Sequence, residues 1–328
     1  MPPTNPLIKG ILYPRAHLSL IGLNNDGYRK FGGIGFSYDT PNIKFSVTES
    51  HKNAVKIFDN ANKLISDNNL LSQRIDAVCR EKGIAKSYAF IVNMQVPRHH
   101  GAGSGTNIAL ACIEAVFILN NMEYTESELI ELSSRGRTSG IGIKTYFNGG
   151  YVMDIGVKNL DNIFLPSNAN SSNLIAQNLV HTKFPDWEFV VCFPKKMISL
   201  TKKEELLFFN NSLPLAENDV YKILYISCFG ITSAILENDF DTFYTALVDL
   251  QKTKWKSLER NNFGSYLNQI ENIIYNCGAC AVAMSSLGPS LIAFSKDVDA
   301  MENQLKKHHE ILEIYRTGSI NKGRILYA

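Results

Sequence analysis

The chain has 328 residues, enough for two domains of ~150 residues or for one large domain. Apolar residues make up 45% and charged residues 20%, which excludes a disordered, collagen-like or disulfide-scaffold chain. The 33 basic and 31 acidic residues nearly balance. We therefore expect no nucleic-acid partner and no membrane partner, and any bound polyanion must be held by a local site.

The cysteines and the N-terminus indicate a reducing compartment. Six scattered cysteines are too few for a disulfide framework, and the pair Cys277 and Cys280 has no second pair at zinc spacing. Residues 1–6 lack the features of a signal peptide. The longest apolar stretch, 220–236, is shorter than the ~20 residues that span a bilayer. We expect a cytoplasmic protein.

Residue patterns in the first half predict strands and helices in alternation. Strands are predicted over 7–12, 17–23, 42–47, 89–96 and 151–157. Helices are predicted over 54–65, 71–78, 107–119 and 126–134, the last capped by Thr125 or Ser127. The polar segment 167–173 or the dozen residues after it should hold the domain boundary, which gives domains 1–180 and 181–328.

The second half predicts an α/β sandwich. Strands are expected over 189–193, 290–294 and 311–317. Helices are expected over 219–236, 240–250, 265–277 and 301–308. Because the connections are short, this order favours a split β-α-β arrangement with helices packed on one face of the sheet.

The most informative segment is the glycine-rich stretch 97–106, between a buried strand and an apolar helix. Glycines 101, 103 and 105 let the backbone turn so that N–H groups point into a concavity, and Ser104 and Thr106 add hydroxyl donors. The positive end of the following helix reaches the same place, so the segment predicts a phosphate site rather than a merely structural turn. It matches neither a Walker A motif nor G-x-G-x-x-G.

Two further segments join this one. Residues 135–142 hold Arg135, Arg137 and Ser139 among glycines, with Lys144 close behind. Such cations can close over a phosphate or a carboxylate, or can simply be solvated. Residues 278–289 are rich in small side chains, which permits close approach of the backbone to a ligand or to another segment.

In this order and spacing the segments resemble the GHMP superfamily, and more closely the β-ribofuranosylaminobenzene 5′-phosphate synthase family of methanopterin biosynthesis. That family reads His-x-Gly-Leu-Gly-Ser-Gly-Thr-Gln, matched by 99–107, and Arg-Gly-x-x-Ser-Gly-Ile-Gly, matched by 135–142. Its Gly-Gly-Phe-x-Val-Asp matches 149–154, its Arg-x-His matches Arg15 and His17, and its Gly-Gly-Ile-Gly matches 32–35. Ala102, Asn107 and Gly22 depart from the family pattern.

The resemblance implies a two-domain α+β, GHMP-kinase-like fold. A ribosomal-protein-S5-like N-terminal domain would hold the phosphate loop, a ferredoxin-like C-terminal domain would follow, and the site would lie between them. The implied reaction joins phosphoribosyl pyrophosphate to a para-substituted benzoate, 4-aminobenzoate or 4-hydroxybenzoate, with Mg²⁺, releasing pyrophosphate and carbon dioxide. A homodimer is expected at the level of the fold.

The resemblance also assigns roles to individual residues. Phosphate binding is expected from Gly101, Gly103, Ser104, Gly105, Thr106, Arg135, Ser139 and Lys144. Catalytic roles are expected for Arg15, His17, His99 and Arg137, where His100 is the alternative to His99 and a core histidine the alternative role for His17. Glu131 and Asp154 are the candidate metal ligands, with a loop-packing carboxylate as the other interpretation of Asp154.

One difference separates this chain from the kinases of the superfamily. Many GHMP kinases carry Ser-Gly-x-Asp where this chain has Gly142 at the end of Ser-Gly-Ile-Gly, so that carboxylate is absent. An ATP-dependent small-molecule kinase is therefore the second hypothesis. A non-catalytic phosphometabolite-binding protein is the third.

Overall fold

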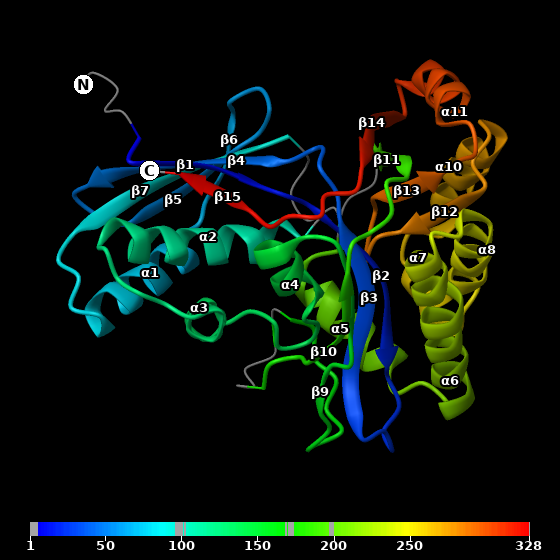
Figure 1. Cartoon of the computed structure of the whole chain (residues 1–328), viewed down its shortest axis with the longest axis horizontal. Coiled ribbons are helices and arrows are strands. Elements are labelled where there is room, and N and C mark those ends of the chain that lie inside the picture. Colours follow the sequence, from blue (N-terminus) through cyan, green and yellow to red (C-terminus); the bar gives the residue numbers. More distant parts are fainter. Residues whose placement is uncertain are drawn as a thin grey trace.

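The computed structural model describes residues 6–95, 101, 103–167, 169, 174–196 and 200–327 (Figure 1). The first layer is a six-stranded sheet. In spatial order its strands are β15 (Ile325–Tyr327), β1 (Ile8–Leu12), β4 (Ile43–Ser50), β7 (Ser87–Met94), β5 (Ala54–Phe58) and β6 (Leu64–Asp67). The C-terminal strand β15 thus returns to pair with β1 near the start of the chain.

Helices α1 (Asn69–Glu81) and α2 (Ser104–Leu119) lie along one face of this sheet (Figure 1). Alternate residues of β7, among them Phe90 and Val92, are buried on that face, as period-two patterning of a half-buried strand requires. Nearly all of α2 after its first turn is buried, because a sheet lies above it and other helices lie beside it. This burial fixes the N-terminus of α2 in space.

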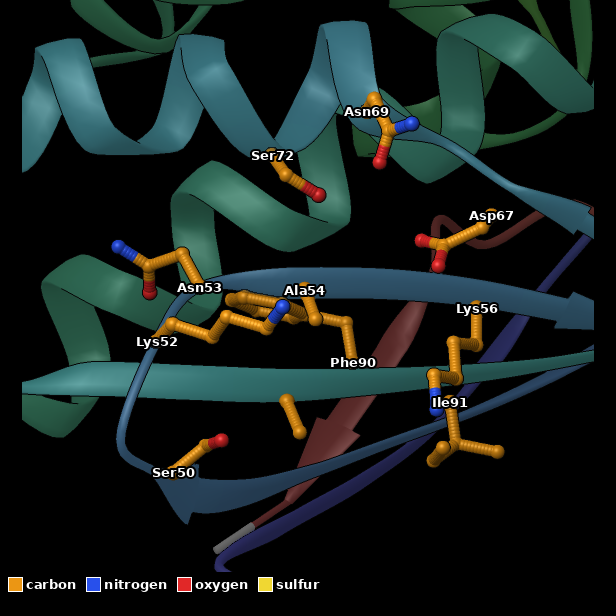
Figure 2. Close-up of a pocket in the computed structure, with 11 residues that line it drawn as sticks. Ser50, Lys52, Asn53, Ala54, Lys56, Asp67, Asn69, Ser72, Phe90 and Ile91 are labelled. Carbon is orange, nitrogen blue, oxygen red and sulfur yellow. The ribbon is translucent and has the colours of Figure 1, made fainter.

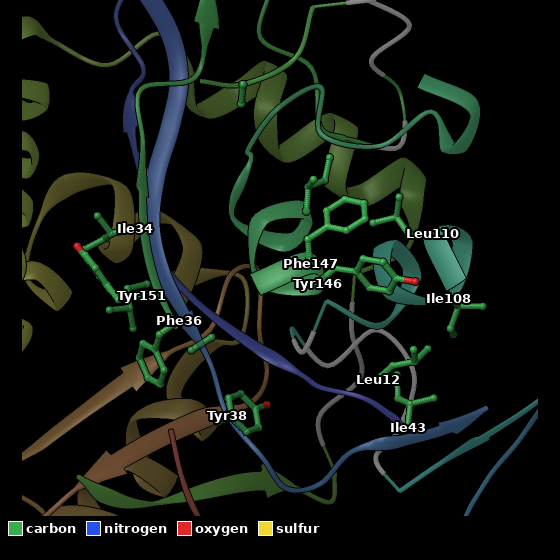
Figure 3. Packing of buried hydrophobic residues seen from close by; sticks show 14 of the residues in the cluster. Leu12, Ile34, Phe36, Tyr38, Ile43, Ile108, Leu110, Tyr146, Phe147 and Tyr151 are labelled. Atoms are coloured by element: carbon green, nitrogen blue, oxygen red, sulfur yellow. The ribbon is translucent and has the colours of Figure 1, made fainter. Parts of the chain in front are cut away.

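The second layer is a sheet in the order β10 (Asn178–Thr182), β8 (Tyr151–Asp154), β3 (Arg29–Ser37) and β2 (Arg15–Gly22), with the short β9 (Val157–Lys158) also paired to β3. Helix α4 (Ile141–Asn148) lies between this sheet and α2, and helix α3 (Glu126–Ser133) packs beside α2. Tyr146 and Phe147 of α4 pack near Leu110 of α2 (Figure 3). This layer therefore holds the start of α4 against β2 and β3.

The third layer is an antiparallel sheet in the order β12 (Ala281–Met284), β13 (Leu291–Phe294), β11 (Glu188–Pro194) and β14 (Leu312–Gly318). Its helices are α5 (Lys202–Ser212), α6 (Glu217–Tyr225), α7 (Ser233–Glu237), α8 (Phe240–Gln251), α9 (Lys254–Asn261), α10 (Gly264–Asn276) and α11 (Val298–Leu305). The π-helical η1 (Ile226–Thr232) joins α6 to α7, and the single-turn η2 (Lys306–His308) follows α11. The predicted two-domain α+β fold is confirmed.

The prediction that helices pack on one face of this sheet is wrong. Ala293 of β13 belongs to a cluster with α10 and α11, whereas its neighbour Phe294 faces the other way. The ring of Phe294 lies 5.0 Å from that of Phe243 on α8. On the same side it also contacts Phe36 of β3, at 6.3 Å. This aromatic contact joins the C-terminal sheet to the second layer.

The helix predicted over 54–65 is also wrong. These residues form β5, a turn and β6. Val55 and Ile57 are buried beside β7, which is parallel to β5, and Asp59 accepts the backbone N–H groups of Ala61 and Lys63 in the turn. In so short a stretch the spacing of apolar residues fits both the helical and the strand period, and pairing with β7 makes residues 54–58 a strand.

Other elements escaped the sequence patterns: β3, α4, β10, α5, α9, β12 and β15. The strand predicted over 151–157 is divided into β8 and β9. Residues 217–237 are long and apolar enough to cross a membrane by composition, yet Ile223, Ile231 and Ala234 are fully buried in the fold.

Candidate active site

The glycine-rich loop enters α2 through two glycines, Gly101 and Gly103, at which any other residue would be strained. Gly101 and Gly103 have φ values of 84° and 73°, in the left-handed region. A Cβ on Gly101 would lie 2.3 Å from the Ser285 carbonyl oxygen, and one on Gly103 would lie 2.7 Å from Cγ of Arg15. No side chain among the described residues caps α2, which leaves N–H groups of its first turn for an anion.

Gly105 differs from its two neighbours. It lies inside the first turn of α2, and among the described residues a Cβ there would meet only Nη2 of Arg135, at 3.8 Å. The space beside Gly105 is thus open and cationic, as a phosphate site requires. Ser104 is buried, whereas Thr106 is half-buried. His99 and its alternative His100 lie outside the described residues.

Arg15 crosses from β2 to the loop. Its Nη1 donates to the Gly101 carbonyl at 3.1 Å, while its Nε is buried without a hydrogen-bond partner among the described residues. A Cβ on Gly142, at the start of α4, would lie 3.3 Å from that Nε. Burial lowers the pKa of Arg15 to about 10, so the side chain stays charged at neutral pH. A half-buried cation whose buried Nε has an unused hydrogen is a ready partner for an anionic ligand group.

His17, two residues further along β2, has its ring over a glycine of β3. A Cβ on Gly33 would lie 3.3 Å from Cε1 and from Nε2 of the imidazole, so the absent side chain makes room for the ring. Nε2 lies 3.3 Å from the Ser139 hydroxyl. Burial, together with the charges of Arg15 and Lys256, holds the pKa of His17 well below its usual value, so the imidazole is neutral.

Asp154, at the end of β8, is completely buried below Ser139. One carboxylate oxygen accepts the Ser139 hydroxyl and the Gly140 N–H, each at 3.0 Å, and the other accepts the Gly156 N–H at 2.9 Å. Burial raises the pKa of Asp154 to about 6, and these donors oppose that rise. Both oxygens already have protein donors, which fits an anchor of the turn before α4 better than a metal ligand.

The three cations of the segment 135–144 have different surroundings. Arg135 lies next to Gly105, and burial and the charge of Arg137 lower its pKa. Arg137 is half-buried in the turn, and Lys144 is half-buried on α4. The structure thus brings Arg15, Arg135 and the glycine loop together.

The two candidate metal ligands, Glu131 and Asp154, have different surroundings in the described part of the chain. Glu131 is exposed on α3, and its backbone carbonyl accepts Nη2 of Arg74. Among the residues that the structure describes, no three His, Cys, Asp or Glu side chains are grouped as a metal would need. Asp154 is held by protein donors and Glu131 is exposed, and because Mg²⁺ is usually bound by one or two carboxylates together with substrate phosphates, the magnesium site stays a prediction.

The sequence patterns missed a residue that connects the two halves of the site. The Ser285 hydroxyl accepts the His17 backbone N–H at 3.0 Å and donates to the Gly101 carbonyl at 2.8 Å. Below it, the buried Lys256 of α9 donates to the Met284 carbonyl at 2.9 Å. The small-residue segment 278–289 had been singled out, but only the fold shows which serine reaches the loop.

A separate cavity of about 290 Å³ lies by β5, β7 and α1 (Figure 2). Its lining includes Ser50, Lys52, Lys56, Asp67 and Ser72. None of the predicted site residues lines it, so the site described above is a different place.

Comparison with known proteins agrees with this geometry. A family model described as the GHMP kinases N terminal domain matches residues 69–148. The chain is 28% identical over 287 residues to the beta-ribofuranosylphenol 5′-phosphate synthase of Methanothermobacter thermautotrophicus, covering 86% of this chain and 87% of that protein. For the protein of the same name from Archaeoglobus fulgidus, the identity is 28% over 296 residues, with 90% of each chain covered.

Solved kinases share the fold. Homoserine kinase from Cytophaga hutchinsonii aligns with a TM-score of 0.66 at 16% identity, covering 98% of this chain and 97% of that one. Mevalonate kinase from Staphylococcus aureus aligns with a TM-score of 0.62 at 17% identity, covering 96% and 98%. The resemblance predicted from the motifs is confirmed: this chain has the two-domain GHMP kinase fold, carries a GHMP kinases N-terminal domain, and along most of its length is similar to archaeal beta-ribofuranosylphenol 5′-phosphate synthases.

Proposed function

We propose that the protein condenses phosphoribosyl pyrophosphate with 4-aminobenzoate or 4-hydroxybenzoate and releases pyrophosphate and carbon dioxide. The observation that carries the proposal is Arg15, a half-buried cation between the glycine-rich loop and Gly142 whose buried Nε has no hydrogen-bond partner among the described residues. An aromatic carboxylate set beside the phosphate loop would satisfy that donor. Similarity to the named synthases supports the same reaction.

The chemistry is an aromatic substitution at the ring carbon that bears the carboxylate. The bond from ribose C1 to pyrophosphate breaks, and the leaving group takes the electron pair. The ring carbon then bonds to C1, while the para amino or hydroxyl group donates electrons. Finally the bond to the carboxylate breaks, carbon dioxide leaves, and the retained electron pair restores aromaticity.

The leaving group is the main electrostatic demand on the protein. N–H groups at the start of α2 and the Arg135 guanidinium beside Gly105 would stabilise the charge that develops on pyrophosphate. A single well-placed donor to developing charge is worth roughly 3–4 kcal/mol. In the proposal Mg²⁺ binds the pyrophosphate of the substrate, because this ion is commonly held by substrate phosphates with few protein ligands.

The second hypothesis, an ATP-dependent kinase, is favoured by the shared fold, by the match of residues 69–148 to the GHMP kinases N terminal domain, and by 23% identity over 332 residues to a 4-diphosphocytidyl-2-C-methyl-D-erythritol kinase. A carboxylate at position 142 would point at Arg15 and use the donor that the benzoate needs. A cytoplasmic location and a homodimer complete the proposal as predictions of the sequence.

Mass spectrometry tests the function directly. The protein is incubated with phosphoribosyl pyrophosphate, Mg²⁺ and each benzoate in turn, and the carboxyl group of the benzoate is ¹³C-labelled. A ribosyl-arene phosphate together with labelled carbon dioxide is the expected result. Tight binding of phosphoribosyl pyrophosphate without turnover of either benzoate would support the non-catalytic hypothesis instead.

A further inference from the structure

Ser139 lies between two groups that both compete for its single hydroxyl proton. Asp154 Oδ2 is 3.0 Å from the Ser139 oxygen, and His17 Nε2 is 3.3 Å from it. A serine hydroxyl has one proton to donate and two lone pairs that accept. Where the proton goes therefore decides how the histidine is protonated.

The carboxylate is the stronger acceptor as well as the nearer one. Hydrogen bonds to an ionised oxygen are roughly twice as strong as those between neutral groups. The Ser139 oxygen also accepts the Ile141 N–H at 3.3 Å, which occupies one of its lone pairs. When the Ser139 hydroxyl donates its hydrogen bond to Asp154, its oxygen can offer His17 only the remaining lone pair. Nε2 of His17 must therefore carry the hydrogen of the bond between them.

We infer that Asp154 acts through Ser139 as a positioning residue, fixing His17 as the neutral Nε2–H tautomer. The backbone supports the same arrangement. Asp154 pairs with Gly33 across β8 and β3, and Gly33 is the residue whose missing Cβ accommodates the His17 ring. Ser285 and Ser286 hold the His17 backbone from the C-terminal half, through His17 N–H at 3.0 Å and His17 C=O at 2.8 Å.

The inference deepens the proposed function and rests on it in one respect. If the benzoate binds beside Arg15, a lone pair on Nδ1 suits the para hydroxyl or amino group, which is a hydrogen-bond donor. Accepting that hydrogen bond increases electron donation into the ring and so favours attack on ribose C1. An Nδ1–H tautomer would present a donor instead and would lack this effect.

Nitrogen NMR of the histidine side chains tests the tautomer without reference to activity. The chain has 7 histidines, so the His17 signals are identified as those lost in the His17→Gln variant. In the wild-type protein at neutral pH we expect a protonated Nε2 and an unprotonated Nδ1. A protonated Nδ1 in the wild-type protein would overturn the inference.

Variants then test the role of the carboxylate. Asp154→Asn introduces an amide that can donate to Ser139, which frees the serine proton to turn toward Nε2; we expect the Nδ1–H population to rise. Ser139→Ala should also lose the tautomer preference, and Ser139→Thr, which keeps the hydroxyl, should restore it. The matched control is Thr138→Ala, whose hydroxyl donates to the Leu165 carbonyl instead and should leave the tautomer unchanged.

Kinetics separate this inference from the proposed function. Ser139→Ala should lower kcat about 10-fold or more, with rescue by Ser139→Thr. Wild-type protein with the Nε2–H tautomer but no synthase activity would contradict the proposed function and leave the positioning role intact. Synthase activity with an unchanged tautomer in both Asp154→Asn and Ser139→Ala would contradict the positioning role alone.

Discussion

Alanine at Gly103 and at Gly105 should have opposite effects on stability. Gly103 has φ near 73°, where an L-residue costs about 1–2 kcal/mol, and its Cβ would push on Arg15 at 2.7 Å. Loss of the bond from Arg15 to the Gly101 carbonyl would add about 1.5–3 kcal/mol. We therefore expect Gly103→Ala to lower the free energy of unfolding by about 2.5–5 kcal/mol. Gly105→Ala lies inside a helix and should raise it by up to about 1 kcal/mol.

The changes in ligand affinity should not parallel the changes in the free energy of unfolding. The Cβ of Gly105→Ala would enter the open space beside Arg135 that we assign to phosphate, so we expect affinity for phosphoribosyl pyrophosphate to fall at least about 10-fold, or about 1.4 kcal/mol. Urea denaturation gives the free energies of unfolding, and calorimetric titration gives the affinities. A more stable protein that binds less ligand is a result that a general packing defect cannot produce.

Gly83 supplies the matched control. Its φ is 66°, yet a Cβ there would have no atom of the described residues within 4 Å. Gly83→Ala should cost only the backbone strain, about 1 kcal/mol, and should leave ligand affinity unchanged. If Gly103→Ala costs no more than Gly83→Ala, the contact with Arg15 is not rigid. If Gly105→Ala binds phosphoribosyl pyrophosphate normally, the phosphate does not lie beside Gly105.

Four other predictions concern the site and its support. Arg15→Ala should raise the KM of the benzoate more than that of phosphoribosyl pyrophosphate, and Arg137→Ala should do the reverse; a rise for the same substrate in both variants would refute this division. Arg324→Met should destabilise the protein by about 3–5 kcal/mol in urea because it leaves the buried carboxylate of Glu114 without its cation, whereas Arg316→Met, at an exposed ion pair, should cost at most about 1 kcal/mol. The pKa of His17 is lower in the folded chain than its usual 6.5, so the unfolded chain binds the proton first and stability should fall as the pH drops below 6.5. The wild-type protein should therefore lose up to about 1.4 kcal/mol per pH unit relative to His17→Gln, and a difference that does not vary with pH would contradict the buried, neutral imidazole. Finally, ATP should not phosphorylate mevalonate, homoserine or galactose, since Gly142 offers no carboxylate; acceptor-dependent ADP release above roughly 1 s⁻¹ would restore the kinase hypothesis.

Local sequence patterns predicted the helices and strands whose pattern of buried residues can be recognised from a few neighbouring residues. The alternation of β7 and the apolar length of α2 are properties of a few neighbouring residues, so they were visible in the chain itself. Patterns failed where a partner decides the conformation. Residues 54–58 are a strand because β7 pairs with them, and β15 is a strand because β1 lies beside it.

The candidate site shows the same division. By itself the sequence determined that glycines precede a helix start, because positive φ and close backbone approach are requirements of single residues. It also indicated the synthase resemblance, through motifs that can be read in order. It could not distinguish a metal-binding Asp154 from an anchoring one, because that depends on which donors reach the carboxylate.

Only the tertiary structure decided those donors. Ser139 and Asp154 meet because α4 begins against the end of β8, and His17 joins them because β2 and β3 pair in a register that sets Gly33 below its ring. Ser285 reaches the loop over a separation of 184 residues from Gly101. Such contacts depend on how strands pair and layers stack. Single segments of the sequence therefore show which residues are available, and the fold determines which of them act together.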